Sequence, residues 1–155
     1  MEKLWEDFAP FADKQFLDEI ETNLKSRFWE MYLGCSFLYN NFKLELPNTK
    51  GGPDLKINYK NTKLWIEAVT PQKGEGNDKL EKPPNMLVVN VPQDKMILRI
   101  QNSIDEKKRN YLGWIDKNVV RENEPFILAI NGSELIFGRT EREMPLILRA
   151  ISQFG

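Results

Sequence analysis

Three short strand candidates, two of which alternate apolar and polar residues, lie between two long segments with helical periodicity, and this order constrains the fold most. Alternation with a period of two is typical of strands with one buried face. A further apolar strand candidate follows the second helical segment. The order helix, three strands, helix, strand predicts an α/β chain whose mixed sheet carries a helix on each face. The segments Phe42–Leu46 and Asp54–Tyr59 alternate, whereas Leu64–Val69 is more apolar and is predicted to be an interior strand.

The two helices are predicted from the spacing of apolar residues. The first should run from about Asp13 to about Tyr39, where apolar residues recur at spacings of three, four and seven. Arg27 is the one polar member of this stripe, and Asn40-Asn41 predicts its end. The second should run from about Gln93 to about Asp116. The strand after it, Pro125–Ile130, reads PFILAI and is predicted to be fully buried.

The segments outside these elements are predicted to be less regular. Residues 1–11 should be an irregular lead-in, and Pro71–Asn85 should be a mobile loop because it is rich in Gly, Pro and charge. Met86–Val91 is a short extended candidate. The 155 residues are expected to form a single domain. No element after the apolar run Pro145–Ile151 closes the fold, so we expect a further C-terminal segment.

Residue counts exclude several classes of function. Lys and Arg total 22 and Asp and Glu total 23, so the net charge is −1 and the protein as a whole does not attract polyanions. The chain has no His, which excludes imidazole-dependent catalysis and His-ligated zinc. Its one cysteine, Cys35, is expected to be a small buried hydrophobe. The N-terminus is unlike a signal peptide and no window is apolar enough to span a bilayer, so we expect a soluble, cytoplasmic protein.

Two carboxylates on neighbouring strands are the first candidates for chemistry. Asp54 opens one strand and Glu67 lies inside the next, 13 residues later. A turn at Lys60-Asn61 would bring the two acids to about the same level of an antiparallel pair. Carboxylates so close repel each other, and a divalent cation would remove the conflict. The alternative is a solvated pair at the edge of the sheet.

A third carboxylate, Glu30, lies in the first helix in the run RFWEMYLG. It lies on the flank of the apolar stripe, one turn beyond Arg27. Its simplest interpretation is a surface ion pair with Arg27, which would contribute little to stability.

These motifs together resemble the PD-(D/E)XK nuclease superfamily, which has the restriction-endonuclease-like fold. The resemblance covers about residues 13–131 and rests on four features. They are the helix Glu in RFWEMYLG, the segment GGPD at residues 51–54, the strand WIEAVTP at residues 65–71, and the strand PFILAI after a helix that bears lysines. The resemblance implies a mixed sheet core flanked by helices, in the order α-β-β-β-α-β.

The activity that the resemblance implies is metal-dependent hydrolysis of phosphodiester bonds. Asp54, Glu67 and the backbone carbonyl of Ala68 would bind Mg²⁺ or Mn²⁺, and Glu30 would contact the metal through water. The lysine of the family motif stands two residues after the strand Glu, where this chain has Val69.

Some family members supply the missing lysine from the following helix. Lys107 lies in a polar row beside the apolar stripe of that helix and is the first candidate, with Lys108 second. The alternative is that both are solvated helix lysines.

The expected partner is nucleic acid, with DNA favoured over RNA, and no membrane. Lys73 and Lys79 on the long loop, and Lys108 and Arg109 on the second helix, are the predicted contacts; each could equally be a solubilising surface charge. A homodimer is a further expectation, since many nucleases of this kind act as dimers. The alternatives are a catalytically inactive module of the same fold, which binds nucleic acid or a protein, and an interaction protein whose acids are mere surface charge.

Overall fold

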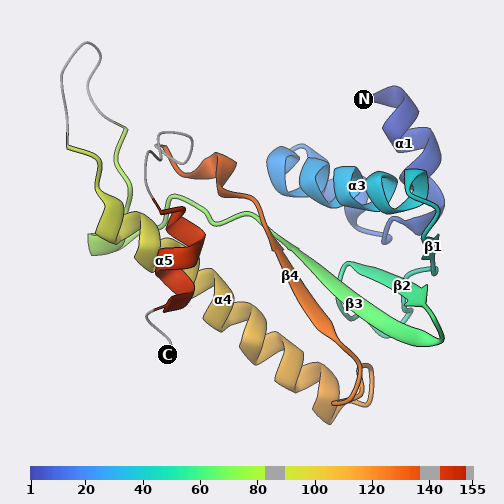
Figure 1. Ribbon diagram of the computed structural model, residues 1–155. Coiled ribbons are helices and arrows are strands. Elements are labelled where there is room, and N and C mark those ends of the chain that lie inside the picture. The colour runs from blue at the N-terminus through green and yellow to red at the C-terminus, as the bar shows by residue number, and fades with distance from the viewer. Residues whose placement is uncertain (83–89, 137–143, 153–155) are drawn as a thin grey trace. The chain divides into compact units, whose positions relative to one another are not determined.

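A computed structural model describes residues 1–82, 90–136 and 144–152 of the chain. It confirms a mixed α/β structure in which helices flank a four-stranded sheet of order β1-β2-β3-β4 (Figure 1). Contacts group the chain into two compact units, Met1–Val69 with Lys107–Ala129, and Thr70–Glu106 with Ile130–Gly155. The α-helices are α1 (Glu2–Phe8), α2 (Phe16–Ile20), α3 (Leu24–Tyr39), α4 (Gln93–Asp116) and α5 (Leu146–Ser152). The strands are β1 (Lys43–Leu44), β2 (Leu55–Tyr59), β3 (Thr62–Val69) and β4 (Phe126–Ile130).

The N-terminal helices differ from the prediction. Residues 1–11 are not irregular, because they form α1 and a 3-10 turn at Ala9–Phe11. The single long helix expected over residues 13–39 is also wrong, because the chain forms α2 and α3 with a turn between them. Thr22 and Asn23 lie at that break, and such short polar side chains favour helix caps over helix interiors. The predicted end of the helix is confirmed, since Asn41 leaves it with a φ of 62°.

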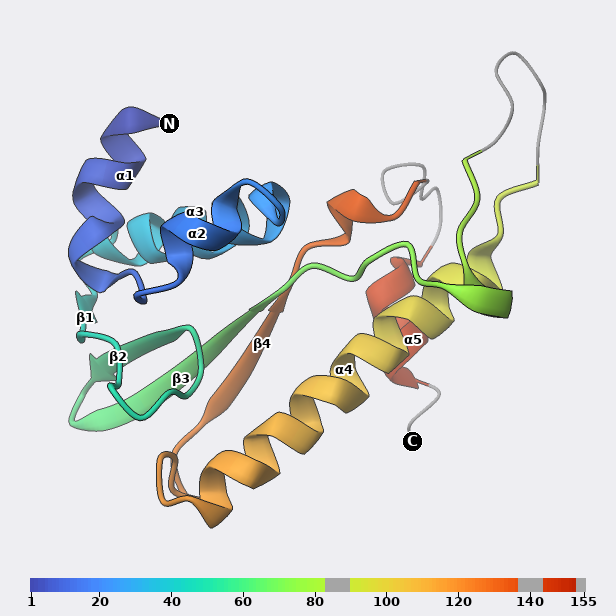
Figure 2. The same cartoon turned by 180° about the vertical axis from the view of Figure 1, so that it is seen from behind.

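α1 and α2 both pack on α3 (Figure 2). Phe8 of α1 is fully buried, and it lies against Gly34 of α3 at a distance that leaves no room for a Cβ atom. Phe8 also contacts Phe16 of α2, with the ring centroids 5.5 Å apart. The aromatic residues of the N-terminal segment therefore form part of the main core.

The three-strand meander is confirmed, although β1 is only two residues long. β2 pairs antiparallel with both β1 and β3. Lys60 and Asn61 have φ values of 49° and 63°, as a two-residue hairpin turn requires. The face of the meander that packs into the main core is apolar. It carries Leu44, Leu55, Ile57, Leu64 and Ile66, which pack with Met31 and Cys35 of α3.

The predicted bounds of α4 are confirmed, and β4 follows it as the outer neighbour of β3. Phe126 of β4 contacts Tyr111 and Trp114 of α4, with ring centroids 4.6 and 6.1 Å apart. The prediction that Pro125–Ile130 is fully buried is wrong. β4 is an edge strand, and Ile127 is 44% exposed.

The second unit has a smaller core of its own. Leu80, Met96, Ile97 and Ile100 pack there with residues of the C-terminal segment, namely Leu135, Leu146 and Ala150. The described part of the expected loop, residues 71–82, contains a 3-10 turn at Gly76–Asp78, and residues 83–85 lie outside the described residues. The Met86–Val91 strand candidate also falls mainly outside them. No helix in the described ranges is long and apolar enough to cross a membrane.

Candidate functional site

Asp54 and Glu67 lie side by side in the first unit, as the sequence predicts. The β2–β3 register pairs Leu55 with Ile66, so Asp54 and Glu67 occupy the next position along the hairpin. The backbone N–H of Asp54 donates to Glu67 Oε2 at 3.3 Å, and the N–H of Ala68 donates to Asp54 Oδ2 at 2.7 Å. Two backbone donors therefore hold the two carboxylates at one end of the hairpin, on the face away from Leu55 and Ile66.

Lys107 completes this group from α4. Its Nζ lies 2.8 Å from Glu67 Oε1, and its side chain is 25% exposed, whereas that of Glu67 is 5% exposed. Lys108, the second candidate, is exposed. Of the two lysines, Lys107 is the one that the structure places on the strand carboxylate.

Glu30 is buried and not part of a surface ion pair. It is 4% exposed, and its Oε2 accepts a hydrogen bond from Arg27 Nη1 at 2.7 Å. The Arg27 side chain is 12% exposed and also contacts Glu19 and Asp13. The interpretation of Arg27 and Glu30 as a weak surface pair is therefore wrong, because Glu30 is buried and Arg27 is also bound by Glu19 of α2, which packs on α3.

Burial and the charges of neighbouring acids raise the proton affinity of Glu30 and Asp54. Burial raises the pKa of Glu30 to about 7, against the opposing charge of Arg27. Burial also raises the pKa of Asp54 well above its usual range, and the charges of Glu67 and Glu30 raise it further. The Asp54 residue keeps some exposed surface, but its carboxyl group is surrounded by protein. The three acids therefore interact electrostatically and form one group.

This group offers few direct ligands to a metal ion. Within the part of the chain that the structure describes, no set of three or more His, Cys, Asp or Glu side chains is arranged to hold a metal. Two adjacent carboxylates are nevertheless a usual protein contribution to a Mg²⁺ site, because Mg²⁺ keeps several of its water molecules. Ala68, whose carbonyl was the third expected ligand, contacts Asp54 through its N–H.

The lysines and arginine predicted to contact nucleic acid fall in both units. Lys108 and Arg109 are exposed on α4 in the first unit. Lys73 and Lys79 are exposed in the second unit, in the segment that Arg99 binds through Gln72 O and Asp78 Oδ2.

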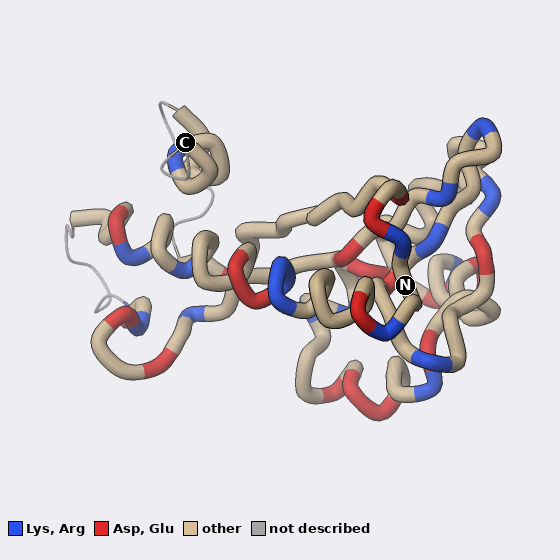
Figure 3. The backbone as a smooth tube through the Cα atoms, turned by 90° about the horizontal axis from the view of Figure 1, so that it is seen from below, with Lys and Arg blue, Asp and Glu red and all other residues tan. Residues whose placement is uncertain are grey.

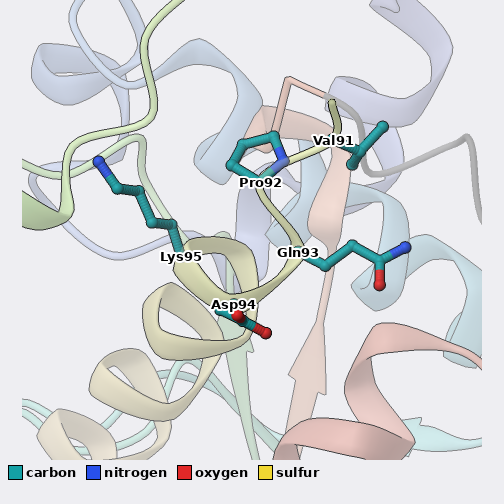
Figure 4. A pocket seen from close by; sticks show the side chains of 5 residues that line it. All are labelled: Val91, Pro92, Gln93, Asp94 and Lys95. Carbon is teal, nitrogen blue, oxygen red and sulfur yellow. The ribbon is translucent and has the colours of Figure 1, made fainter. Parts of the chain in front are cut away.

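A hollow at the start of α4 is a separate feature of the second unit (Figure 4). Five consecutive residues, Val91–Lys95, line it. The side chains of Gln93 and Lys95 point to opposite sides, so they do not converge on a ligand. We do not assign it a catalytic role.

Comparisons with family models, curated proteins and solved structures give no match to this chain.

The sequence interpretation missed the residues that surround the site. It did not identify Glu19 and Asp13 as partners of Arg27, nor the lysines on the polar face of the hairpin. Those lysines could have been found, since the alternation in DLKINYKNTKLWIEA places Lys56 and Lys63 on the same face as Asp54 and Glu67. The partners of Arg27 depend on the unpredicted break between α2 and α3, so no local signal indicates them.

Proposed function

We propose that this chain is a metal-dependent nuclease domain that hydrolyses phosphodiester bonds, with DNA as the favoured substrate. The single observation that carries the proposal is the group formed by Asp54, Glu67 and Lys107. Two carboxylates stand side by side on neighbouring strands, and a lysine from a separate helix binds one of them. A structural ion pair would need only one of these acids.

The chemistry of the donors fits a divalent cation. Asp54, Glu67 and Glu30 are hard oxygen donors that repel one another, and burial increases the free-energy cost of that repulsion. Asp54 and Glu67 would be the direct ligands, with the Ala68 carbonyl beside them and Glu30 reached through water. When bound there, Mg²⁺ or Mn²⁺ would lower the pKa of a water molecule and stabilise charge on the scissile phosphate.

The protein's own groups would orient the reaction. The N–H of Ala68 fixes one oxygen of Asp54, and the N–H of Asp54 restrains one oxygen of Glu67. Lys107 holds the other oxygen of Glu67, which brings an ammonium group to the site. That ammonium would offset phosphate charge and orient the attacking water, which is the role of the lysine that the PD-(D/E)XK motif places where this chain has Val69.

The test is nicking of supercoiled plasmid DNA with Mg²⁺ or Mn²⁺. We expect metal-dependent nicking that Asp54→Asn and Glu67→Gln each abolish. Lys107→Ala should also reduce it strongly, and more than Lys108→Ala, which removes the neighbouring exposed lysine. Equal activity of the Lys107 and Lys108 variants would contradict the assignment of Lys107.

The second candidate function is a catalytically inactive module that binds nucleic acid or a protein. One observation favours it, namely that Val69 stands where the motif has its lysine. Metal binding that Asp54→Asn abolishes, without cleavage of any DNA or RNA substrate, would support this alternative over the nuclease.

A further inference from the structure

The polar face of the β1–β3 meander carries a cluster of lysines next to the candidate site. On β2 and β3, residues that alternate with the core residues lie on this face. Opposite pairs along the hairpin are Asp54 with Glu67, Lys56 with Trp65, and Asn58 with Lys63. β1 extends the last pair into a row of three, because Lys43 pairs with Asn58.

Beyond the two acids of the site, the lysines of this face outnumber its acids, which are Glu45 and Glu124. Against the opposing effect of burial, the charge of Lys63 contributes to lowering the pKa of Glu124. Lysines and acids are interspersed along much of the chain (Figure 3), so a group with few acids is a local feature. Glu45, which directly follows β1, brings an acid to this face and lies beside Lys56, with Oε2 3.0 Å from Nζ. Lys43 is exposed, as is Lys60 in the hairpin turn.

Trp65 holds two of these lysines in place. The Nζ atoms of Lys56 and Lys63 lie 5.5 and 5.8 Å from the centre of its ring. Trp65 itself is 3% exposed, and its Nε1–H donates to Glu124 Oε2 at 2.7 Å. The ring therefore makes cation–π contacts with the two ammonium groups, and it is too buried to stack on a base.

We propose that Lys43, Lys56 and Lys63 form a track that binds the phosphate backbone on one side of the scissile phosphate. This inference rests on the proposed function, which supplies the nucleic acid. At about 3.3 Å per residue, Lys56 lies roughly 7 Å along the hairpin from Asp54, and Lys63 roughly 13 Å from Glu67. Phosphates of one DNA strand are spaced about 3.4 Å along the duplex axis, so these lysines would meet phosphates about two to four nucleotides away.

The three lysines of the track do not themselves read base sequence. The charged groups of the track are lysine ammonium ions, which bind phosphate as point charges, and its aromatic ring is buried. Contacts to phosphate position a duplex without specifying its bases. The substrate class that these lysines favour is therefore DNA that extends several nucleotides beyond the cleavage point.

The test is the salt dependence of binding to a fluorescent duplex of about 30 base pairs. Binding is measured in the Asp54→Asn background, so that cleavage does not interfere. Lys43→Gln with Lys63→Gln should lower the slope of log Kd against log salt by about 1.8, because each phosphate that a lysine neutralises adds about 0.9 to this slope. The matched control, Lys3→Gln with Lys14→Gln, removes the same charge from exposed positions in the N-terminal helical segment and should leave the slope unchanged.

A second variant tests the track without removing a lysine. Glu45→Gln frees Lys56 from its acidic neighbour, so it should tighten DNA binding several-fold, whereas a purely structural ion pair would leave the affinity unchanged. Unchanged melting temperatures verify that all variants fold.

The outcomes separate this inference from the nuclease proposal. A lower slope together with no cleavage by the unsubstituted protein supports the track and contradicts the nuclease. If cleavage is normal and the slope of log Kd against log salt is the same for the Lys43/Lys63 variant and its control, the track is overturned and the nuclease proposal is supported. Absence of DNA binding by every variant overturns the track as well, and would point instead to an acidic protein as the partner of this face.

Discussion

Burial of Glu30 predicts that the protein loses stability as the pH rises through neutrality. The pKa of this acid rises from its ordinary 4.5 to about 7 in the folded chain. Between these values the folded state binds more protons than the unfolded state, so the free energy of unfolding falls with rising pH. At about 1.36 kcal/mol for each tenfold change in proton affinity, Glu30 accounts for a fall of roughly 3 kcal/mol between pH 5 and pH 8.

The assay is urea unfolding at pH 5 and pH 8 with divalent cations removed by a chelator. Asp54 adds to the fall, since its pKa is raised in the same direction. Glu30→Gln should remove the share that Glu30 contributes. Glu19→Gln is the matched control, because Glu19 also contacts Arg27 but its side chain is 39% exposed. In this variant the free energy of unfolding should fall between pH 5 and pH 8 as much as in the unsubstituted protein.

Two results would refute this reasoning. One is a free energy of unfolding that is the same at pH 5 and pH 8 in the unsubstituted protein. The other is a Glu30→Gln variant whose stability falls as much as that of the Glu19→Gln control. If the proposed metal site exists, Mn²⁺ should also raise the melting temperature more at pH 8 than at pH 5, because the acids then bind the cation without first losing a proton.

Three further predictions concern the packing of the chain. Gly34→Ala should destabilise the protein by about 1–3 kcal/mol in urea unfolding, because the new methyl group would overlap the ring of Phe8, and an unchanged stability would show that α1 can move aside. Asn41→Ala should cost about 1 kcal/mol, because at a φ of 62° the polar side chain of Asn is tolerated better than the methyl group of Ala, and Asn41→Gly should cost almost nothing, because Gly adopts this φ freely; equal effects would argue against strain at this helix end. Arg99→Ala should speed proteolysis within residues 72–80, because it removes the 2.7 Å hydrogen bond to Asp78, and an unchanged cleavage pattern by mass spectrometry would contradict that role.

The sequence predicts the elements that have strong periodicity. It does not predict elements, or their burial, where these depend on tertiary contacts. The bounds of α4 and the hairpin turn at Lys60-Asn61 follow from local patterns, and both are confirmed. α1 was missed because seven residues give little periodic signal, and it is Phe8 that fixes this helix on α3. The burial of β4 was overestimated, because an apolar run does not reveal whether its strand lies at the centre or the edge of a sheet.

Only the part of the candidate site that local sequence patterns determine was predictable. Asp54 and Glu67 share a hairpin, so turn position and alternation suffice to bring them together. Lys107 comes from a helix 40 residues after Glu67, and only its place in a polar row indicated it. Glu30 is buried beside Arg27, which Glu19 of α2 also binds, and the sequence did not indicate that α2 packs on α3 in this way.

The free-energy cost of burying Asp54, Glu67 and Glu30 together bears on what these acids are for. A buried ion pair is often no more stable than apolar residues of the same volume, and a group with more acids than bases is worse. Lys107 contacts Glu67 and Arg27 contacts Glu30, but the pKa of Asp54 still lies well above its usual range. Selection for stability alone would favour Asp54→Asn, which keeps an acceptor for the Ala68 N–H and removes the charge. A divalent cation bound there, as in the proposed function, would offset all three acids at once.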